Sequence, residues 1–152
     1  MIECSFELNN KPMSVFKCGG KSFPAFSGLQ AYANRRAFAC VTDVGPIPPG
    51  AYYIIDRQSG GILGPLRDMV SGQKDWFSLY GIDNNIDDEV YCNQVARGNF
   101  RLHPKGVYGI SKGCITIEAI DDFQVIKNIL KKSMQIEIPG KHILAYGKVS
   151  VR

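Results

Sequence analysis

Hydrophobic and polar residues alternate in the first segment of the chain, where Ile2, Cys4 and Phe6 are separated by polar side chains. A period of two is typical of a strand that buries one face. Two asparagines then supply a turn, and a short strand at 13–16 is expected to pair back, which predicts an N-terminal hairpin at about residues 1–17. The glycine, serine and proline residues that follow predict an irregular connection at 19–28.

Six later segments are enriched in β-branched and aromatic residues, which favour strands. The prolines of 45–50 (GPIPPG) exclude a helix there and lead into the first of these segments. Trp76, Phe77 and Tyr80 could line a substrate groove, but we expect them to pack in the core of the sheet and assign them no site. The predicted strands are 51–56, 76–80, 99–103, 114–117, 134–138 and 143–151.

One segment, 120–132, has the period of a helix, because Phe123, Ile126 and Leu130 fall on one helical face. Two aspartates near its start and two lysines at its end match the helix macrodipole. The chain has 152 residues, 45% of them hydrophobic, and no repeat or linker, so we expect a single domain that spans it. The patterns together predict a mostly β fold with one main helix after the strand at 114–117.

Composition narrows the classes of function. The formal net charge of +4 comes from 18 Lys and Arg spread along the chain, which does not favour nucleic-acid binding. No stretch approaches the ~18 to 20 apolar residues of a membrane-spanning helix, and the first residues lack the pattern of an export signal. No phosphate-binding loop is present, and we expect no cofactor.

The chain has five cysteines and no CxxC pair, which argues against a disulfide framework or a zinc ribbon. Because the number is odd, at least one thiol should stay outside disulfides.

A histidine and a cysteine that can meet lie in the segment 97–118. His103 ends one predicted strand and Cys114 begins the next, with a glycine-rich turn between them. A thiol at neutral pH is only a few per cent thiolate, so a catalytic cysteine needs a neighbouring base, which histidine usually supplies. Gly113 allows a tight turn and leaves backbone N–H groups available to stabilise an oxyanion. The pattern indicates acyl transfer with Cys114 as nucleophile and His103 as base.

Two other interpretations of these residues stay open. A lone cysteine can be a small buried hydrophobic residue, and a lone histidine at a strand end can be structural. Alternatively, Cys92, His103 and Cys114 recur at equal spacing and could bind zinc, with His142 as a fourth ligand. Structural zinc sites normally place their ligands in close pairs, which this spacing lacks, so we predict no metal site.

The chain resembles the signature of the L,D-transpeptidase catalytic (YkuD-like) fold at His103, Gly109, Ser111, Gly113, Cys114 and Ile115. Three longer stretches resemble the small L,D-transpeptidase effectors that bacteria deliver through type VI secretion: 45–54 (GPIPPGAYYI), 76–80 (WFSLY) and 97–104 (RGNFRLHP). The resemblance covers roughly residue 45 to the C-terminus. It implies that the mostly β fold is a mixed β-sandwich of the L,D-transpeptidase type, with the one main helix after the nucleophile strand.

Two positions depart from the wider YkuD-like pattern, which usually has a histidine before the Gly-Cys pair and an arginine two positions after the cysteine. Lys112 and Thr116 occupy these positions here. In place of the missing arginine, Arg97 or Arg101 could bind a substrate carboxylate. Ser111 is similar to the family serine that orders the nucleophile loop.

The resemblance implies an enzyme that acts on peptidoglycan peptide stems. The Cys114 thiolate would attack the carbonyl between diaminopimelate and D-alanine, with His103 as base, and the acyl-enzyme would pass to water, a D-amino acid or a second stem. Transfer to water is L,D-carboxypeptidase activity, and transfer to an amine is L,D-transpeptidase activity. A catalytically silent peptidoglycan-binding β module is the alternative. A papain-like enzyme is disfavoured, because its cysteine precedes its histidine.

The resemblance also implies where the protein acts and what it meets there. The chain would be made in the cytoplasm without a signal peptide, carried by a component of the secretion machinery, and active in the periplasm of a target bacterium. A cognate immunity protein in the producer would block the cleft.

Overall fold

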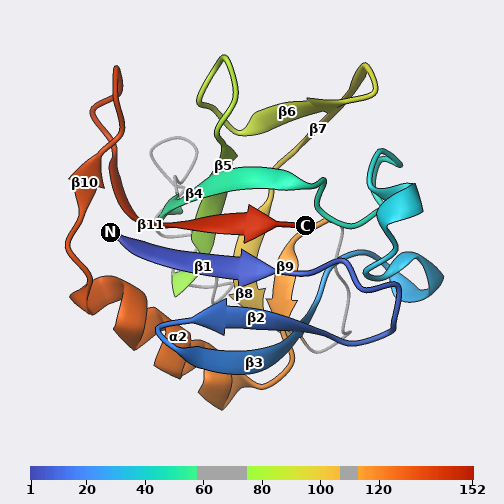
Figure 1. The fold of residues 1–152 in the computed structure, drawn as a ribbon, viewed down its shortest axis with the longest axis horizontal. Helices are drawn as coiled ribbons and strands as arrows, with labels where there is room; N and C mark the ends of the chain where they lie inside the picture. The colour runs from blue at the N-terminus through green and yellow to red at the C-terminus, as the bar shows by residue number, and fades with distance from the viewer. Residues whose placement is uncertain (58–74, 107–112) are drawn as a thin grey trace.

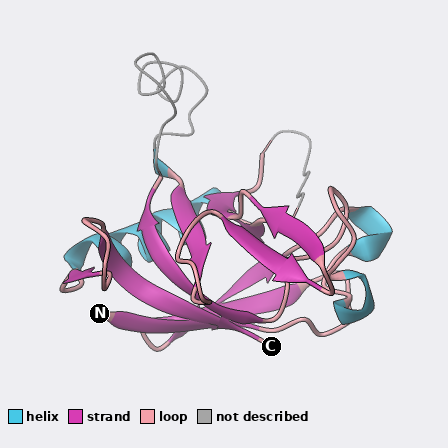
Figure 2. Ribbon diagram, turned by 90° about the horizontal axis from the view of Figure 1, so that it is seen from above, coloured by secondary structure: helices cyan, strands magenta, loops and turns pink. Residues whose placement is uncertain are grey.

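The computed structural model describes residues 1–57, 75–106 and 113–152. Over these ranges the chain forms a nine-stranded mixed sheet, a two-stranded ribbon, one α-helix and two short 3-10 helices (Figure 1, Figure 2). In chain order the elements are β1 (Ile2–Phe6), β2 (Ser14–Cys18), β3 (Lys21–Phe26), η1 (Gln30–Tyr32), η2 (Arg36–Phe38), β4 (Gly50–Asp56), β5 (Phe77–Gly81), β6 (Glu89–Cys92), β7 (Val95–Gly98), β8 (Arg101–Pro104), β9 (Ile115–Ile117), α2 (Ile120–Lys132), β10 (Ile136–Glu137) and β11 (Leu144–Val151).

The large sheet closes on itself, because β1 pairs with both β2 and β11 (Figure 1). The strand order is β1-β2-β3-β9-β8-β5-β4-β11, and β10 pairs with the start of β11. The β1–β11 and β8–β9 pairs are parallel, and the other described pairs are antiparallel. Opposite walls of the closed sheet therefore face each other as the layers of a sandwich do. The predicted mostly β fold, with a mixed sheet and one main helix, is confirmed.

The predicted N-terminal hairpin is present as β1 and β2. It is part of the closed sheet rather than an addition to it, since β1 also pairs with β11 and β2 with β3. The irregular connection predicted at 19–28 is wrong, because β3 lies within it. Pro24 fits this strand because its carbonyl accepts the Glu118 N–H just past the end of β9. Proline has no N–H to donate. At Pro24 this lack falls on the side of β9 where the β3–β9 pairing ends, so the strand tolerates it.

The sequence patterns also fail to predict the β6–β7 ribbon. The buried position of β7 is an arginine, Arg97, and β6 has no buried residue, so the hydrophobic alternation of a strand is missing. A disulfide between Cys40 and Cys92 ties the end of β6 to the segment after η2. The expectation that at least one thiol stays outside disulfides is confirmed for Cys4, Cys18 and Cys114.

The helix α2 has the bounds that the apolar period predicts, and it buries Phe123, Ile126 and Leu130. It packs on β8, β9 and β11. Each fully buried apolar side chain of this size stabilises the fold by roughly 1.5 to 3 kcal/mol, so α2 holds β8 and β9 firmly in place. In the described part of the chain, no helix is long and apolar enough to cross a membrane.

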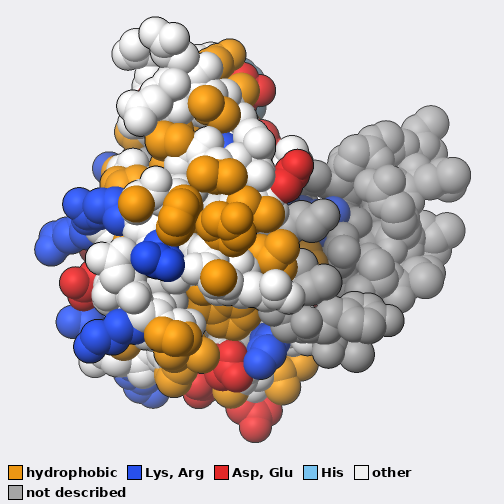
Figure 3. All heavy atoms as spheres, turned by 90° about the vertical axis from the view of Figure 1, so that its right-hand side faces the viewer, with side chains coloured by type: hydrophobic (Ala, Val, Ile, Leu, Met, Phe, Trp, Pro, Cys, Tyr) orange, Lys and Arg blue, Asp and Glu red, His pale blue; other side chains and the backbone are white. Residues whose placement is uncertain are grey.

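One side of the molecule carries η1 and η2 and faces the viewer in Figure 3. Hydrophobic side chains gather in the middle of this face, and Lys and Arg side chains lie mostly along one border. Tyr32 and Val41, from this part of the chain, are 37% and 39% exposed. This side therefore presents apolar area to solvent next to positive charge.

Candidate active site

The parallel pair β8–β9 brings the predicted histidine and cysteine to one place. Its register sets Leu102 opposite Ile115 and His103 opposite Thr116. Continued by one residue, the same register sets Cys114 opposite Arg101. Side chains alternate between the faces of a strand, which puts Cys114 and Thr116 on one face. His103 is on that face too, since its Nε2 lies 3.5 Å from Thr116 Oγ1. The histidine and the thiol are therefore neighbours on adjacent strands.

The His103 imidazole is buried and held in one tautomer. Its Nδ1 lies 2.7 Å from the Pro104 carbonyl oxygen. A carbonyl can only accept a hydrogen bond, so Nδ1 carries the proton and Nε2 is left as the basic nitrogen. Burial lowers the pKa of His103 below its ordinary value, although the hydrogen bond to Pro104 opposes this. At neutral pH the imidazole is therefore neutral and ready to accept a proton.

Trp76 lies at this site, whereas its residue type favoured a place in the core. Its indole stacks on the His103 imidazole with ring centroids 4.2 Å apart and planes inclined by 19°. Arg57 in turn lies over the Trp76 ring, with Cζ 5.6 Å from the centroid. The expectation that Trp76 packs in the core is wrong, because it is half-buried at the site, whereas the adjacent Phe77 is in the core. The stacking fixes the plane of the imidazole.

Gly113 occupies a position that no side chain fits. Its φ is +94°, a conformation that favours glycine. A Cβ atom there would lie 2.6 Å from Arg97 Nη2 and 3.0 Å from Phe100 Cε1. The glycine thus lets the chain turn into Cys114 while packing directly on a buried arginine.

The Cys114 thiol is half-buried, and its Sγ lies 3.8 Å from the Asn99 carbonyl oxygen. Burial raises the pKa of Cys114 above its ordinary value. A backbone hydrogen bond from Arg101 and the positive charges of Arg101 and Arg57 act in the opposite direction. The thiol is therefore protonated at neutral pH, and it needs a base to become a nucleophile.

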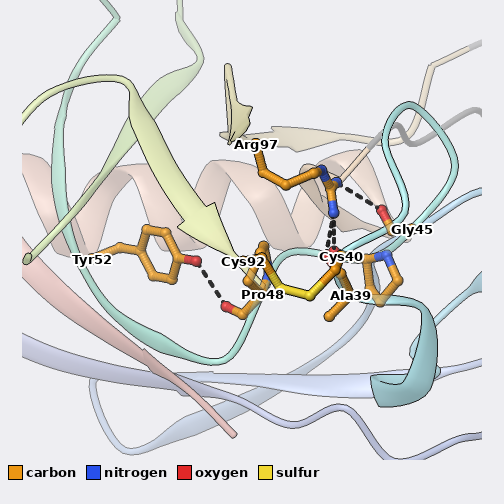
Figure 4. Close-up of a disulfide and its surroundings, with 8 residues drawn as sticks. Ala39, Cys40, Gly45, Pro48, Tyr52, Cys92 and Arg97 are labelled. Atoms are coloured by element: carbon orange, nitrogen blue, oxygen red, sulfur yellow. Dashed lines mark hydrogen bonds between the residues drawn. A yellow bond between two sulfur atoms is a disulfide. The ribbon is translucent and has the colours of Figure 1, made fainter. Parts of the chain in front are cut away.

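Arg97 from β7 anchors the segment that precedes β4 (Figure 4). Its guanidinium donates to the carbonyl oxygens of Ala39, Gly45 and Pro46, the last two at 3.1 and 3.2 Å. The side chain points into this turn next to the Cys40–Cys92 disulfide (Figure 4). The structure thus places Arg97 against Gly113, with its donors on protein carbonyls.

Arg101 lies beside the thiol and forms an ion pair. Its Nη1 and Nη2 each lie 2.8 Å from an oxygen of Asp88, and Nη1 also donates to the Phe100 carbonyl at 2.8 Å. This paired geometry is the strong form of an arginine–carboxylate contact. A role of Arg97 or Arg101 in holding substrate stays a prediction. Ser111, Gly109 and Lys112 lie outside the described residues.

The residues considered for zinc are not brought together. Cys92 is in the disulfide, and His142 is exposed and lies 3.4 Å from Glu137. Among residues 1–57, 75–106 and 113–152, no three His, Cys, Asp or Glu side chains are placed to hold a metal ion.

Comparison with known proteins gives one finding. A family model described as the Tlde1 domain matches residues 21–141, which include every element from β3 to β10. Neither the curated proteins nor the solved structures gave a match.

Proposed function

Because the chain belongs to the Tlde1 domain family of type VI secretion L,D-transpeptidase effectors, we propose that it is a cysteine enzyme that cleaves peptidoglycan stems. The bond cleaved is the one between diaminopimelate and the terminal D-alanine of a tetrapeptide. The observation that carries this proposal is the neutral, oriented imidazole of His103 on the strand next to Cys114. A fixed base beside a protonated thiol is what general-base activation requires.

The proposed reaction has two steps. His103 Nε2 takes the thiol proton, and Cys114 Sγ attacks the carbonyl carbon between diaminopimelate and D-alanine. Backbone N–H groups at Gly113 and Cys114 stabilise the oxyanion. When the intermediate collapses, the C–N bond breaks, His103 gives its proton to the D-alanine amine, and a thioester to Cys114 remains. Ser111 orders the nucleophile loop.

The acceptor of the acyl group determines which of two activities the enzyme shows. Water releases a tripeptide stem, and the protein then acts as an L,D-carboxypeptidase. A free D-amino acid gives exchange, and the amine of a second stem gives a crosslink, both of which are transpeptidation. In each case His103 accepts a proton from the attacking group, so one pair of residues serves all three outcomes.

The alternative function is a catalytically silent module that binds peptidoglycan, and one experiment separates the two. Purified protein is incubated with tetrapeptide muropeptides, and the masses of the products are measured by mass spectrometry. The proposed enzyme removes or exchanges D-alanine, whereas Cys114→Ala leaves the muropeptides unchanged at an unaltered melting temperature. Muropeptides that stay intact with the wild type as well would favour the silent module.

We also propose that the protein acts in the periplasm of a target bacterium. Membership of a type VI effector family supports secretion and action on a target cell wall. The partners would be a component of the secretion machinery and a cognate immunity protein that blocks the site. Expressed in a sensitive bacterium, the protein should be harmless in the cytoplasm and toxic with a periplasmic export signal, unless Cys114 is replaced by Ala. Toxicity confined to the cytoplasmic form would contradict this.

A further inference from the structure

Two cysteines that the proposed reaction does not use face each other across the N-terminal hairpin. The β1–β2 register pairs Ser5 with Lys17. Continued by one residue, it sets Cys4 opposite Cys18. Both side chains are buried, at 5% and 2% exposure, and both belong to the same hydrophobic core cluster. The two cysteines therefore project from the same face of the hairpin.

The spacing of this pair suits a disulfide. In an antiparallel ladder, the Cα atoms of residues directly opposite each other lie about 4.5 to 5.5 Å apart. A disulfide joins residues whose Cα atoms are roughly 4.4 to 6.8 Å apart. The thiols also interact, since a hydrogen bond between the two side chains, together with burial, raises the pKa of Cys4. The same hydrogen bond lowers the pKa of Cys18, although burial opposes this. The two sulfur atoms thus lie close together while both are reduced.

The pair also borders a pocket on the surface. This pocket has a volume of about 310 Å³, and both cysteines contribute to its lining. Lys17 and Arg152 add positive charge to the lining, and Glu3 adds negative charge. An oxidant in solution can therefore approach the pair from this side without crossing the core.

The other three cysteines of the chain have different surroundings. Cys40 and Cys92 form a disulfide, and Cys114 is at the candidate active site. A bond between Cys4 and Cys18 would leave Cys114 as the one cysteine of the five outside a disulfide. It would therefore keep Cys114 from pairing with Cys4 or Cys18 under oxidising conditions.

We propose that Cys4 and Cys18 are the site of a second disulfide, formed by exchange with a small-molecule disulfide such as oxidised glutathione. Cys18 Sγ, as thiolate, attacks one sulfur of the oxidant, whose S–S bond breaks and releases one glutathione. Cys4 Sγ then attacks Cys18 Sγ in the mixed disulfide and releases the other glutathione. The cysteine pair is oxidised, and the oxidant takes up its electrons and thiol protons as it becomes reduced glutathione. The new bond joins β1 to β2 where the sheet closes (Figure 1).

The first test is a redox titration, which needs no peptidoglycan and does not depend on the proposed function. Folded wild type is equilibrated with graded mixtures of reduced and oxidised glutathione, quenched in acid, alkylated with iodoacetamide in denaturant and digested with trypsin. Because trypsin cleaves after Lys17, crosslinked and separate cysteine peptides differ in mass. Mass spectrometry should find Cys4 crosslinked to Cys18 in the oxidising mixtures, with Cys114 in no crosslink. Separate Cys4 and Cys18 peptides in every mixture, or a crosslink from either to Cys114, would overturn the proposal.

The second test measures what the bond does to stability. Closing a loop of about 15 residues restricts the unfolded chain and should raise the Tm of a domain of this size by about 6 to 12 °C. The Tm is compared before and after treatment with oxidised glutathione, in the wild type and in the double variant Cys4→Ala, Cys18→Ala. The wild type should gain stability and the double variant should not. An equal gain in both would contradict a stabilising bond at this pair, and the titration of the wild type decides the question if the double variant does not fold.

Discussion

Cys114 lies between two regions that use arginine in different ways. On one side, Arg97 is buried, donates to carbonyls and packs against Gly113 beside a disulfide. On the other side, Trp76 is half-buried and stacks on His103, and Arg57 lies over the Trp76 ring. The first region holds the turn at Gly113 in place, and the second fixes the plane of the His103 imidazole. The contacts of an arginine therefore indicate its role better than its distance from a motif in the sequence.

The largest effect is expected from loss of the base. His103→Gln should lower the rate of D-alanine release on the order of a hundredfold or more, because general-base catalysis typically contributes 10² to 10⁴. The measurement is kcat/KM on tetrapeptide muropeptides, with the melting temperature as a check on folding. A variant that is folded and retains most of its activity would show that another group deprotonates Cys114.

A smaller loss is expected when the nucleophile turn is disturbed. Gly113→Ala places a Cβ against Arg97 and Phe100 at a positive φ, which should cost about 2 to 4 kcal/mol of unfolding free energy. Activity should fall about tenfold, because displacement of the thiol is expected to raise the activation free energy by about 1.4 kcal/mol.

Gly140→Ala is the control for this substitution. Its φ is +76°, but a Cβ there meets no atom within 4 Å. It should lose only about 1 kcal/mol of stability and no activity. Equal losses in the two variants would mean that backbone conformation, rather than contact with Arg97, limits position 113.

The disulfide region should affect stability more than chemistry. Replacing both Cys40 and Cys92 by Ala should lower the unfolding free energy by about 2 to 4 kcal/mol in urea denaturation. Below the unfolding transition, kcat should stay within about threefold of the wild type, because neither residue touches His103 or Cys114 in the described contacts. A large loss of kcat in the folded variant would show that the disulfide region also affects catalysis.

The smallest signal concerns the resting protonation state. The pKa of Cys114 is raised, so its thiol is protonated below that value, and the pKa of His103 is lowered, so its imidazole is neutral at pH 7. Thiolate absorbance at 240 nm, taken as wild type minus Cys114→Ala, should be near zero at pH 7 and appear only above the pH at which an ordinary thiol ionises. A signal at pH 7 would instead indicate a thiolate–imidazolium pair.

Much of the fold could be predicted, since the signals for it are local. The 120–132 helix is marked by its apolar period and terminal charges, and the 51–56 strand by its β-branched and aromatic residues. The closure of the sheet through β1 and β11 joins the two ends of the chain, and no local pattern encodes such a pairing. β3 was hidden by Pro24, and β7 by an arginine at its buried position.

Sequence could indicate a site residue only where the residue type is characteristic of a particular reaction. His103, Gly113 and Cys114 stand out in the sequence because a thiol, a base and a flexible turn occur in one segment, and the structure brings His103 and Cys114 to adjacent strands, while their catalytic roles stay predictions. For Trp76 we favoured the core over a substrate groove, because a tryptophan in a strand usually packs in the core. Arg57 gave no signal in the sequence, since its place depends on the pairing of β4, β5 and β8.

The most direct test of the account is to trap the acyl-enzyme. The wild type is mixed with a tetrapeptide stem, quenched in acid to preserve the thioester, digested and analysed by mass spectrometry. The account predicts a tripeptide stem, without its D-alanine, attached to the Cys114 peptide, and no adduct in Cys114→Ala. Release of D-alanine by Cys114→Ala, or an adduct on Cys4 or Cys18 instead, would contradict the assignment of Cys114 as the nucleophile.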